Sequence, residues 1–124
     1  MSISVVETTF SATVLESDVL VLVHFWAPWC GLCRMITPVL NHFQTEWAGY
    51  VKLVDVNADE NLRLANTYRL STLPTLLLFD QGEVQQRFDT FRGKEDLRLA
   101  LDAVMHSRQL IQDVPRLVRV YPQA

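Results

Sequence analysis

The segment FWAPWCGLC, residues 25–33, contains both cysteines of the chain and joins two different sequence patterns. Residues 19–26 are almost all apolar and mostly β-branched or aromatic, which is typical of a strand that is buried on both faces of a parallel sheet. Residues 29–47 repeat apolar side chains at helical spacing. The sequence therefore predicts that the two cysteines lie where a buried strand turns into a helix.

Outward from this junction, the same patterns predict four more strands and three more helices. The strands cover residues 3–6, 51–56, 75–80 and 83–89, and the helices cover residues 8–16, 59–68 and 93–106. The early alternation of strands and helices predicts a parallel sheet with helices on both faces. Gln81-Gly82 is a hairpin signal, so the last two strands add an antiparallel edge. We expect an α/β fold with a central mixed sheet.

The chain has 124 residues, which suits one domain. We place this domain at residues 1–106 and a C-terminal extension at residues 107–124. The extension carries six apolar residues, and they are Leu110, Ile111, Val114, Leu117, Val118 and Val120. Such a segment is too apolar for a disordered tail. We predict that it packs on the domain or on a partner, with a free tail as the alternative.

Charge and hydropathy exclude several classes of partner. The net charge of −3 implies no general attraction to nucleic acid or to anionic membranes. The longest apolar run, residues 19–23, is far too short to span a bilayer. Residues 1–10 lack the basic and apolar regions of a signal peptide. We therefore expect a cytoplasmic protein that binds neither nucleic acid nor membrane.

Cys30 and Cys33 cannot form a disulfide framework, and in a reducing compartment such a pair is more often catalytic or metal-binding than structural. The expected helix would begin at Cys30, where unpaired backbone N–H groups and the helix dipole favour the reactive thiolate. Cys33 would lie one turn further along the helix, more buried and close enough to form a disulfide. We predict that Cys30 attacks a substrate disulfide and that Cys33 then releases the reduced substrate.

Residues 25–33 resemble the active-site segment of thioredoxins. Leu73-Pro74-Thr75 and the strand after it resemble the cis-proline loop of that family. Gly82-Glu83-Val84 resembles its hairpin, and Met35-Ile36-Thr37-Pro38 resembles its helix with an internal proline. The resemblance extends from about residue 3 to residue 106. It implies a thioredoxin fold and a redox-active disulfide that takes part in electron transport and cell redox homeostasis.

The resemblance also implies further roles. Pro74 should be cis and should face the cysteines, and Leu73 should offer backbone groups to an extended substrate peptide. The implied substrate-binding residues are Trp29, Gly31, Leu32, Thr72, Leu73, Pro74 and Thr90. We expect a monomer without a cofactor, which acts on protein disulfides. Its electrons would come from a separate reductase, because the chain has no dinucleotide fingerprint or flavin site.

Four positions depart from the usual thioredoxin pattern. Leu32 replaces a proline, and we predict a less reducing pair because a backbone N–H is restored there. Thr90 replaces a glycine beside the docking groove. His24 replaces a buried aspartate, and Asp55 replaces a lysine on the next strand. We predict that His24 and Asp55 form one catalytic acid–base pair beneath Cys33, the alternative being that His24 is only a buried core histidine.

Several alternatives remain open at this point. The chain could be a thioredoxin-like binding module or chaperone in which redox chemistry is dispensable, or an isomerase-like exchanger with a more oxidising pair. The cysteines could also be a silent structural pair. A zinc site would need two more ligands, and the sequence has only His24, His42 and His106 and no second CxxC motif. We therefore expect no metal.

Overall fold

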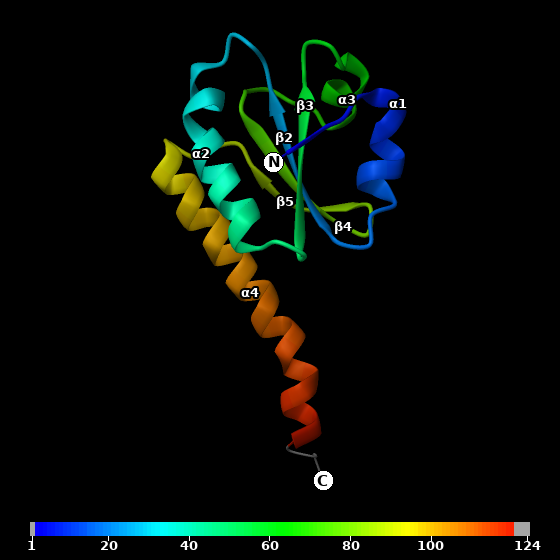
Figure 1. The fold of residues 1–124 in the computed structure, drawn as a ribbon, viewed down its shortest axis with the longest axis vertical. Helices are drawn as coiled ribbons and strands as arrows, with labels where there is room; N and C mark the ends of the chain where they lie inside the picture. The colour runs from blue at the N-terminus through cyan, green and yellow to red at the C-terminus, as the bar shows by residue number, and fades with distance from the viewer. Residues whose placement is uncertain (1, 121–124) are drawn as a thin grey trace.

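A computed structural model describes the backbone of residues 2–120 and the side chains of residues 2–108. A central sheet of five strands separates helices on its two faces (Figure 1). The elements are β1 (Ile3–Ser4), α1 (Glu7–Phe10), the π-helical turn η1 (Ser11–Leu15), β2 (Leu20–Trp26), α2 (Gly31–Glu46), β3 (Val51–Asn57), α3 (Leu62–Thr67), β4 (Thr75–Asp80), β5 (Glu83–Phe88) and α4 (Lys94–Val120). The predicted α/β fold with a mixed sheet is confirmed.

The strand order is β1-β3-β2-β4-β5, so β2 lies at the centre of the sheet. β1 and β2 are parallel to β3, and the pairs β2–β4 and β4–β5 are antiparallel. β2 is flanked by strands on both sides and covered on both faces, which explains its nearly continuous apolar sequence. The C-terminal end of β2 and the N-terminal end of β4 lie side by side at the same end of the strands, because Phe25 pairs with Thr75.

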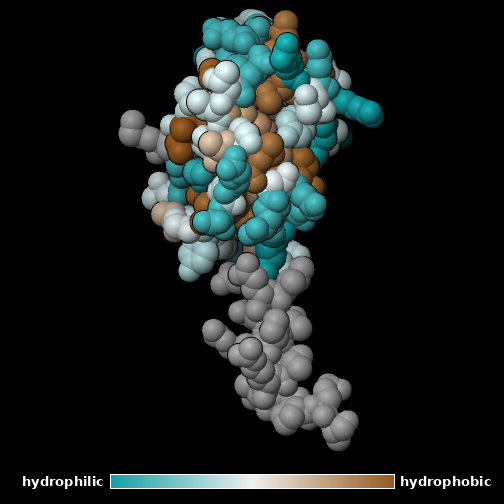
Figure 2. Space-filling model, turned by 90° about the vertical axis from the view of Figure 1, so that its right-hand side faces the viewer, coloured by the Kyte–Doolittle hydropathy of each residue, from teal (hydrophilic) through white to brown (hydrophobic). Residues whose placement is uncertain are grey.

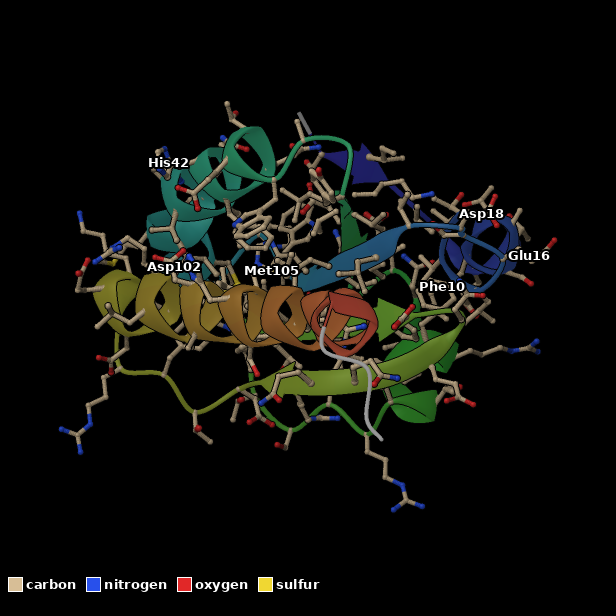
Figure 3. The ribbon with its side chains drawn as sticks, turned by 90° about the horizontal axis from the view of Figure 1, so that it is seen from below. Phe10, Glu16, Asp18, His42, Asp102 and Met105 are labelled. Atoms are coloured by element: carbon tan, nitrogen blue, oxygen red, sulfur yellow. A yellow bond between two sulfur atoms is a disulfide. The ribbon has the colours of Figure 1, made fainter. Side chains whose placement is uncertain are left out.

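Two hydrophobic clusters fill the space on either side of the sheet. One lies under α2 and α4 and includes Leu22, Ile36, Leu40, Leu97 and Leu101. The other lies on the opposite face, where Phe10 of α1 and Phe25 of β2 are buried. Figure 3 shows the same division from below, with His42, Asp102 and Met105 on the α2–α4 side and Phe10 on the other.

The outer face over α1 and α3 mixes hydrophobic residues with hydrophilic ones (Figure 2). Val6 just before α1 and Leu62 at the start of α3 are large apolar residues that remain exposed. Single exposed apolar residues of this kind are common on protein surfaces.

Two predicted helices have different bounds in the structure. The helix expected at residues 59–68 begins only at Leu62, because the Asn57 side chain accepts hydrogen bonds from the backbone N–H groups of Asp59 and Glu60 and holds them in a turn. The helix expected at residues 93–106 continues to Val120, so the predicted domain boundary falls inside α4.

α4 is the longest helix, and its C-terminal part continues away from the sheet (Figure 1). The predicted packing of the apolar residues between Leu110 and Val120 lies outside the described side chains. Within residues 2–120, no helix has both the length and the apolar character of a membrane span.

Candidate active site at the start of α2

Cys30 and Cys33 form a disulfide at the junction of β2 and α2, with their Cα atoms 5.3 Å apart. Cys30 is the N-cap residue of α2, as predicted, and the backbone N–H of Cys33 donates to its Sγ at 3.1 Å. The N-terminus of a helix stabilises negative charge, so this position favours a thiolate at Cys30 once the disulfide is reduced. Cys33 was predicted to be the more buried of the two. Both cysteines are buried in the disulfide form, Cys30 at 4% and Cys33 at 3% exposure, so the difference between them is small.

The loop before β4 lies at the same end of the sheet as the start of α2. The Leu73–Pro74 peptide bond is cis, as expected. Pro74 directly precedes Thr75, whose pairing with Phe25 places it beside the end of β2. The Thr75 hydroxyl donates to the Thr72 carbonyl at 2.7 Å, which closes the loop. Thr72 is exposed, Leu73 is half-buried and Pro74 is buried.

Trp29, directly before Cys30, is held by a residue that the sequence analysis did not assign to the site. Its side chain is 67% exposed, and its Nε1–H donates to Asp59 Oδ2 at 2.8 Å. β2 and β3 are parallel, and Trp26 pairs with Asn57, so the segments after both strands meet at one edge. An acidic residue shortly after β3 could therefore have been predicted as a hydrogen-bond partner of the Trp29 indole.

His24 and Asp55 lie directly opposite each other on β2 and β3. His24 Nδ1 is 3.3 Å from Asp55 Oδ1, and the Ser2 hydroxyl donates to the other carboxylate oxygen. An ionised carboxylate can only accept hydrogen bonds, so Nδ1 carries the proton that is shared with Asp55. In the neutral imidazole, Nε2 is then an acceptor. His24 is only 5% exposed, and no residue of the described part of the chain bonds to Nε2.

A cavity of about 240 Å³ lies between this pair and Cys33, and its walls include His24, Asp55, Ser2 and Cys33. From the sequence, we predicted that His24 and Asp55 would meet beneath Cys33 if their strands were neighbours. These strands, β2 and β3, are neighbours in the sheet. Ser2 was not predicted to be part of the site. It lies just before β1 and reaches Asp55 because β1 pairs with β3, and local sequence does not predict this pairing.

The other two histidines are not part of this arrangement. His42 is exposed on α2, 3.7 Å from Glu46, and His106 on α4 bonds to the Asp102 carbonyl at 2.7 Å. Among the residues that the structure describes, no three His, Cys, Asp or Glu side chains are grouped to hold a metal ion.

The site lies within the part of the chain that a protein-family model matches. A family model described as Thioredoxin matches residues 1–103. Thioredoxin 1 of Nostoc sp. is 48% identical over 79 residues, which are 64% of this chain and 74% of that protein. Thioredoxin 1 of Synechococcus elongatus is 47% identical over 90 residues, 73% and 81% of the two chains. Thioredoxin of Rickettsia felis is 39% identical over 107 residues, 86% and 99% of the two chains.

Proposed function

The chain belongs to the thioredoxin family and is a thiol–disulfide oxidoreductase, and from this basis we propose that Cys30 is its attacking cysteine and Cys33 its resolving cysteine. The observation that carries this assignment is the position of Cys30 as the N-cap of α2, with the Cys33 amide donating to its sulfur. Cys33 lies inside the helix and beside the cavity that contains His24.

The reaction then has two steps. The Cys30 thiolate attacks one sulfur of the substrate disulfide, forms a mixed disulfide and displaces the first substrate thiolate. Cys33 loses its proton and attacks Cys30 Sγ, which displaces the second substrate thiolate and leaves the Cys30–Cys33 disulfide. Two electrons pass from the dithiol to the substrate. A separate reductase returns two electrons to the disulfide.

His24 is suited to accept the proton of Cys33 in the second step. Its Nε2 is an acceptor, lies at the same cavity as Cys33 and has no other partner among the described residues. Asp55 holds Nδ1–H and so keeps the ring in this tautomer, while Ser2 holds Asp55. Imidazole is a common general base in enzymes. The pair therefore serves the resolving step.

The substrates are proteins that carry disulfides, and an extended segment of each would dock beside Trp29 and Gly31. The remaining walls of this docking surface are Leu32, Thr72, Leu73, Pro74 and Thr90. A reducing compartment such as the cytosol suits this function, because disulfides there are mostly transient and catalytic.

Trapping experiments with the two cysteine variants test the assignment. Cys33→Ser should accumulate mixed disulfides with a protein substrate, because the attacking thiolate remains and the resolving thiol is lost. Cys30→Ser should trap almost none and should reduce no insulin. Non-reducing gels and insulin precipitation in the presence of dithiothreitol measure these two outcomes.

Full insulin reduction by Cys30→Ser would refute the assignment. A wild-type protein that is folded, forms the disulfide and still reduces no insulin would instead favour the alternative of a binding module or chaperone.

A further inference from the structure

Arg87 on β5 connects three separate parts of the chain. Its Nε donates to Asp89 Oδ2 at 2.8 Å, its Nη1 donates to the Tyr68 carbonyl at 2.7 Å, and its Nη2 donates to the Arg69 carbonyl at 2.9 Å. The side chain is about two-thirds buried, with 33% of its surface exposed. One guanidinium therefore binds a carboxylate on its own strand end and two backbone carbonyls beyond α3.

The two carbonyls belong to the end of α3. The Arg69 N–H donates to the Asn66 carbonyl and the Leu70 N–H donates to the Ala65 carbonyl, which is the hydrogen-bond pattern of a Schellman motif. Arg69 has a φ of 53°, a left-handed conformation that is unfavourable for a residue with a side chain. The motif leaves the Tyr68 and Arg69 carbonyls without helical partners, and Arg87 supplies donors and a positive charge to both.

Arg87 bonds to two carbonyls after α3 and to the Asp89 carboxylate after β5. Each of these sites lies at the start of a segment that contributes residues to the proposed docking surface. The chain from Arg69 continues through Thr72 and Leu73 to cis-Pro74. On the other side, Asp89 directly precedes Thr90. Phe88 pairs with Leu76, so the end of β5 and the start of β4 lie at the same edge of the sheet. One side chain therefore bonds to the start of the segment that leads to Leu73 and to the residue before Thr90.

We propose that Arg87 is a positioning residue that holds the two sides of the substrate groove, the loop of residues 70–74 and the segment that begins at Thr90, in place for an extended protein segment. This inference rests on the proposed function. The three contacts need the planar guanidinium, because its donors point in fixed, separate directions. A lysine has one ammonium group and cannot reach all three acceptors in the same geometry. A small disulfide reagent needs the cysteines but not the groove.

Single-turnover kinetics separate this role from general stability. Pre-reduced wild type, Arg87→Gln and Arg87→Lys are mixed with excess insulin, and with 5,5′-dithiobis(2-nitrobenzoate) as the small disulfide. Arg87→Gln should raise the half-saturating insulin concentration about three- to tenfold, because the groove is no longer held for binding. The limiting rate, and the rate with the small disulfide, should stay within about twofold of wild type. The half-saturating insulin concentration of Arg87→Lys should lie between those of wild type and Arg87→Gln.

Arg98→Gln is the matched control, since Arg98 also pairs with carboxylates, those of Glu95 and Asp102, but is an exposed residue of α4 beside α2 and outside the proposed groove. It should behave as wild type with both substrates. Asp89→Asn leaves the carbonyl contacts of Arg87 intact and weakens one anchor. Asp89→Asn should raise the half-saturating insulin concentration by a smaller factor than Arg87→Gln does. If Arg87→Gln does not fold, the result with Asp89→Asn tests the inference in its place.

An unchanged half-saturating concentration in Arg87→Gln, or in Asp89→Asn where that variant decides, would overturn the inference. An equal loss with insulin and with the small disulfide would also overturn it, because a purely structural role predicts that result. A wild-type protein without exchange activity would refute the proposed function and with it this inference, whereas the two outcomes above overturn the role of Arg87 alone.

Discussion

At the scale of single residues, the contact between His24 and Asp55 predicts a coupled effect on the resolving step. We expect His24→Ala and Asp55→Asn each to slow release of the mixed disulfide, and the double variant to lose little more than His24→Ala alone. Without Asp55, the imidazole is no longer held with Nε2 as acceptor, so both variants remove the same function. The rate should depend less on pH in His24→Ala, because the imidazole no longer takes part in the proton transfer. Quenched-flow measurement of mixed-disulfide decay at several pH values gives all three rates.

His42→Ala is the control for this experiment, because His42 is an exposed imidazole on α2 that lies outside the cavity. It should leave the profile unchanged. Independent, additive losses that do not vary with pH would mean that His24 is only a buried core histidine.

Leu32 is predicted to make the cysteine pair less reducing than a proline at the same position would. It is the second residue of α2, where backbone N–H groups have no partner within the helix. We expect that N–H to stabilise the Cys30 thiolate and so the reduced form, whereas proline has no N–H to offer. Leu32→Pro should therefore lower the reduction potential by some tens of millivolts, where 30 mV corresponds to about 1.4 kcal/mol.

Equilibration with glutathione buffers measures this potential. Leu32→Ala keeps the N–H but loses the side chain that packs against the α2–α4 cluster, so it should differ much less from wild type. An unchanged or higher potential in Leu32→Pro would contradict the prediction.

At the scale of elements, the turn between β4 and β5 is closely packed against η1. Gln81 and Gly82 have φ values of 55° and 82°, and a Cβ added at Gly82 would lie 2.8 Å from the backbone oxygen of Leu15. Gly82→Ala therefore combines an unfavourable φ with a clash that backbone atoms cannot relieve cheaply. We expect it to lower the free energy of unfolding by about 2–4 kcal/mol in urea denaturation.

Gly49 provides the matched variant. It has a φ of 87°, but a Cβ there would meet nothing within 4 Å. Gly49→Ala should cost only the conformational part, about 1–2 kcal/mol. Equal losses in the two variants would show that the hairpin moves away from Leu15 without cost.

At the scale of the whole molecule, the described members of both hydrophobic clusters and of the active site come before the last part of α4. Among the described side chains of α4, the last buried core residue is Met105, and Arg108 forms an ion pair with Asp80. A chain that ends at Arg108 should therefore unfold cooperatively. We expect its free energy of unfolding to stay within about 1 kcal/mol of the full chain, and its exchange rate with a small disulfide to be unchanged.

Urea denaturation and the same exchange assay test this expectation. A large loss of stability would show that residues 109–124 pack on the domain, which is one of the two possibilities that their apolar sequence predicts. Retained stability with weaker binding of a protein partner would support the other.

The sequence by itself determined the features that depend on neighbouring residues along the chain. The apolar run of β2 predicted a central strand, and the position of Cys30 before a helical repeat predicted an N-cap cysteine, because both patterns are local. The exchanged residues His24 and Asp55 also stood out in the sequence alone. The bounds of α3 and α4 were less predictable, because the turn at Asn57 depends on the hydrogen bonds of one side chain and α4 continues past the last core residue that the structure describes.

Only the tertiary structure decided which distant residues meet. Asp59 holds Trp29, Ser2 holds Asp55, and Arg87 holds the end of α3. These partners are between 19 and 53 positions apart in the chain. Their contacts follow from strand order and register, which arise when the two hydrophobic clusters assemble around the sheet. Local periodicity predicts that a strand exists, but it does not specify which strand lies beside it or which residue lies opposite.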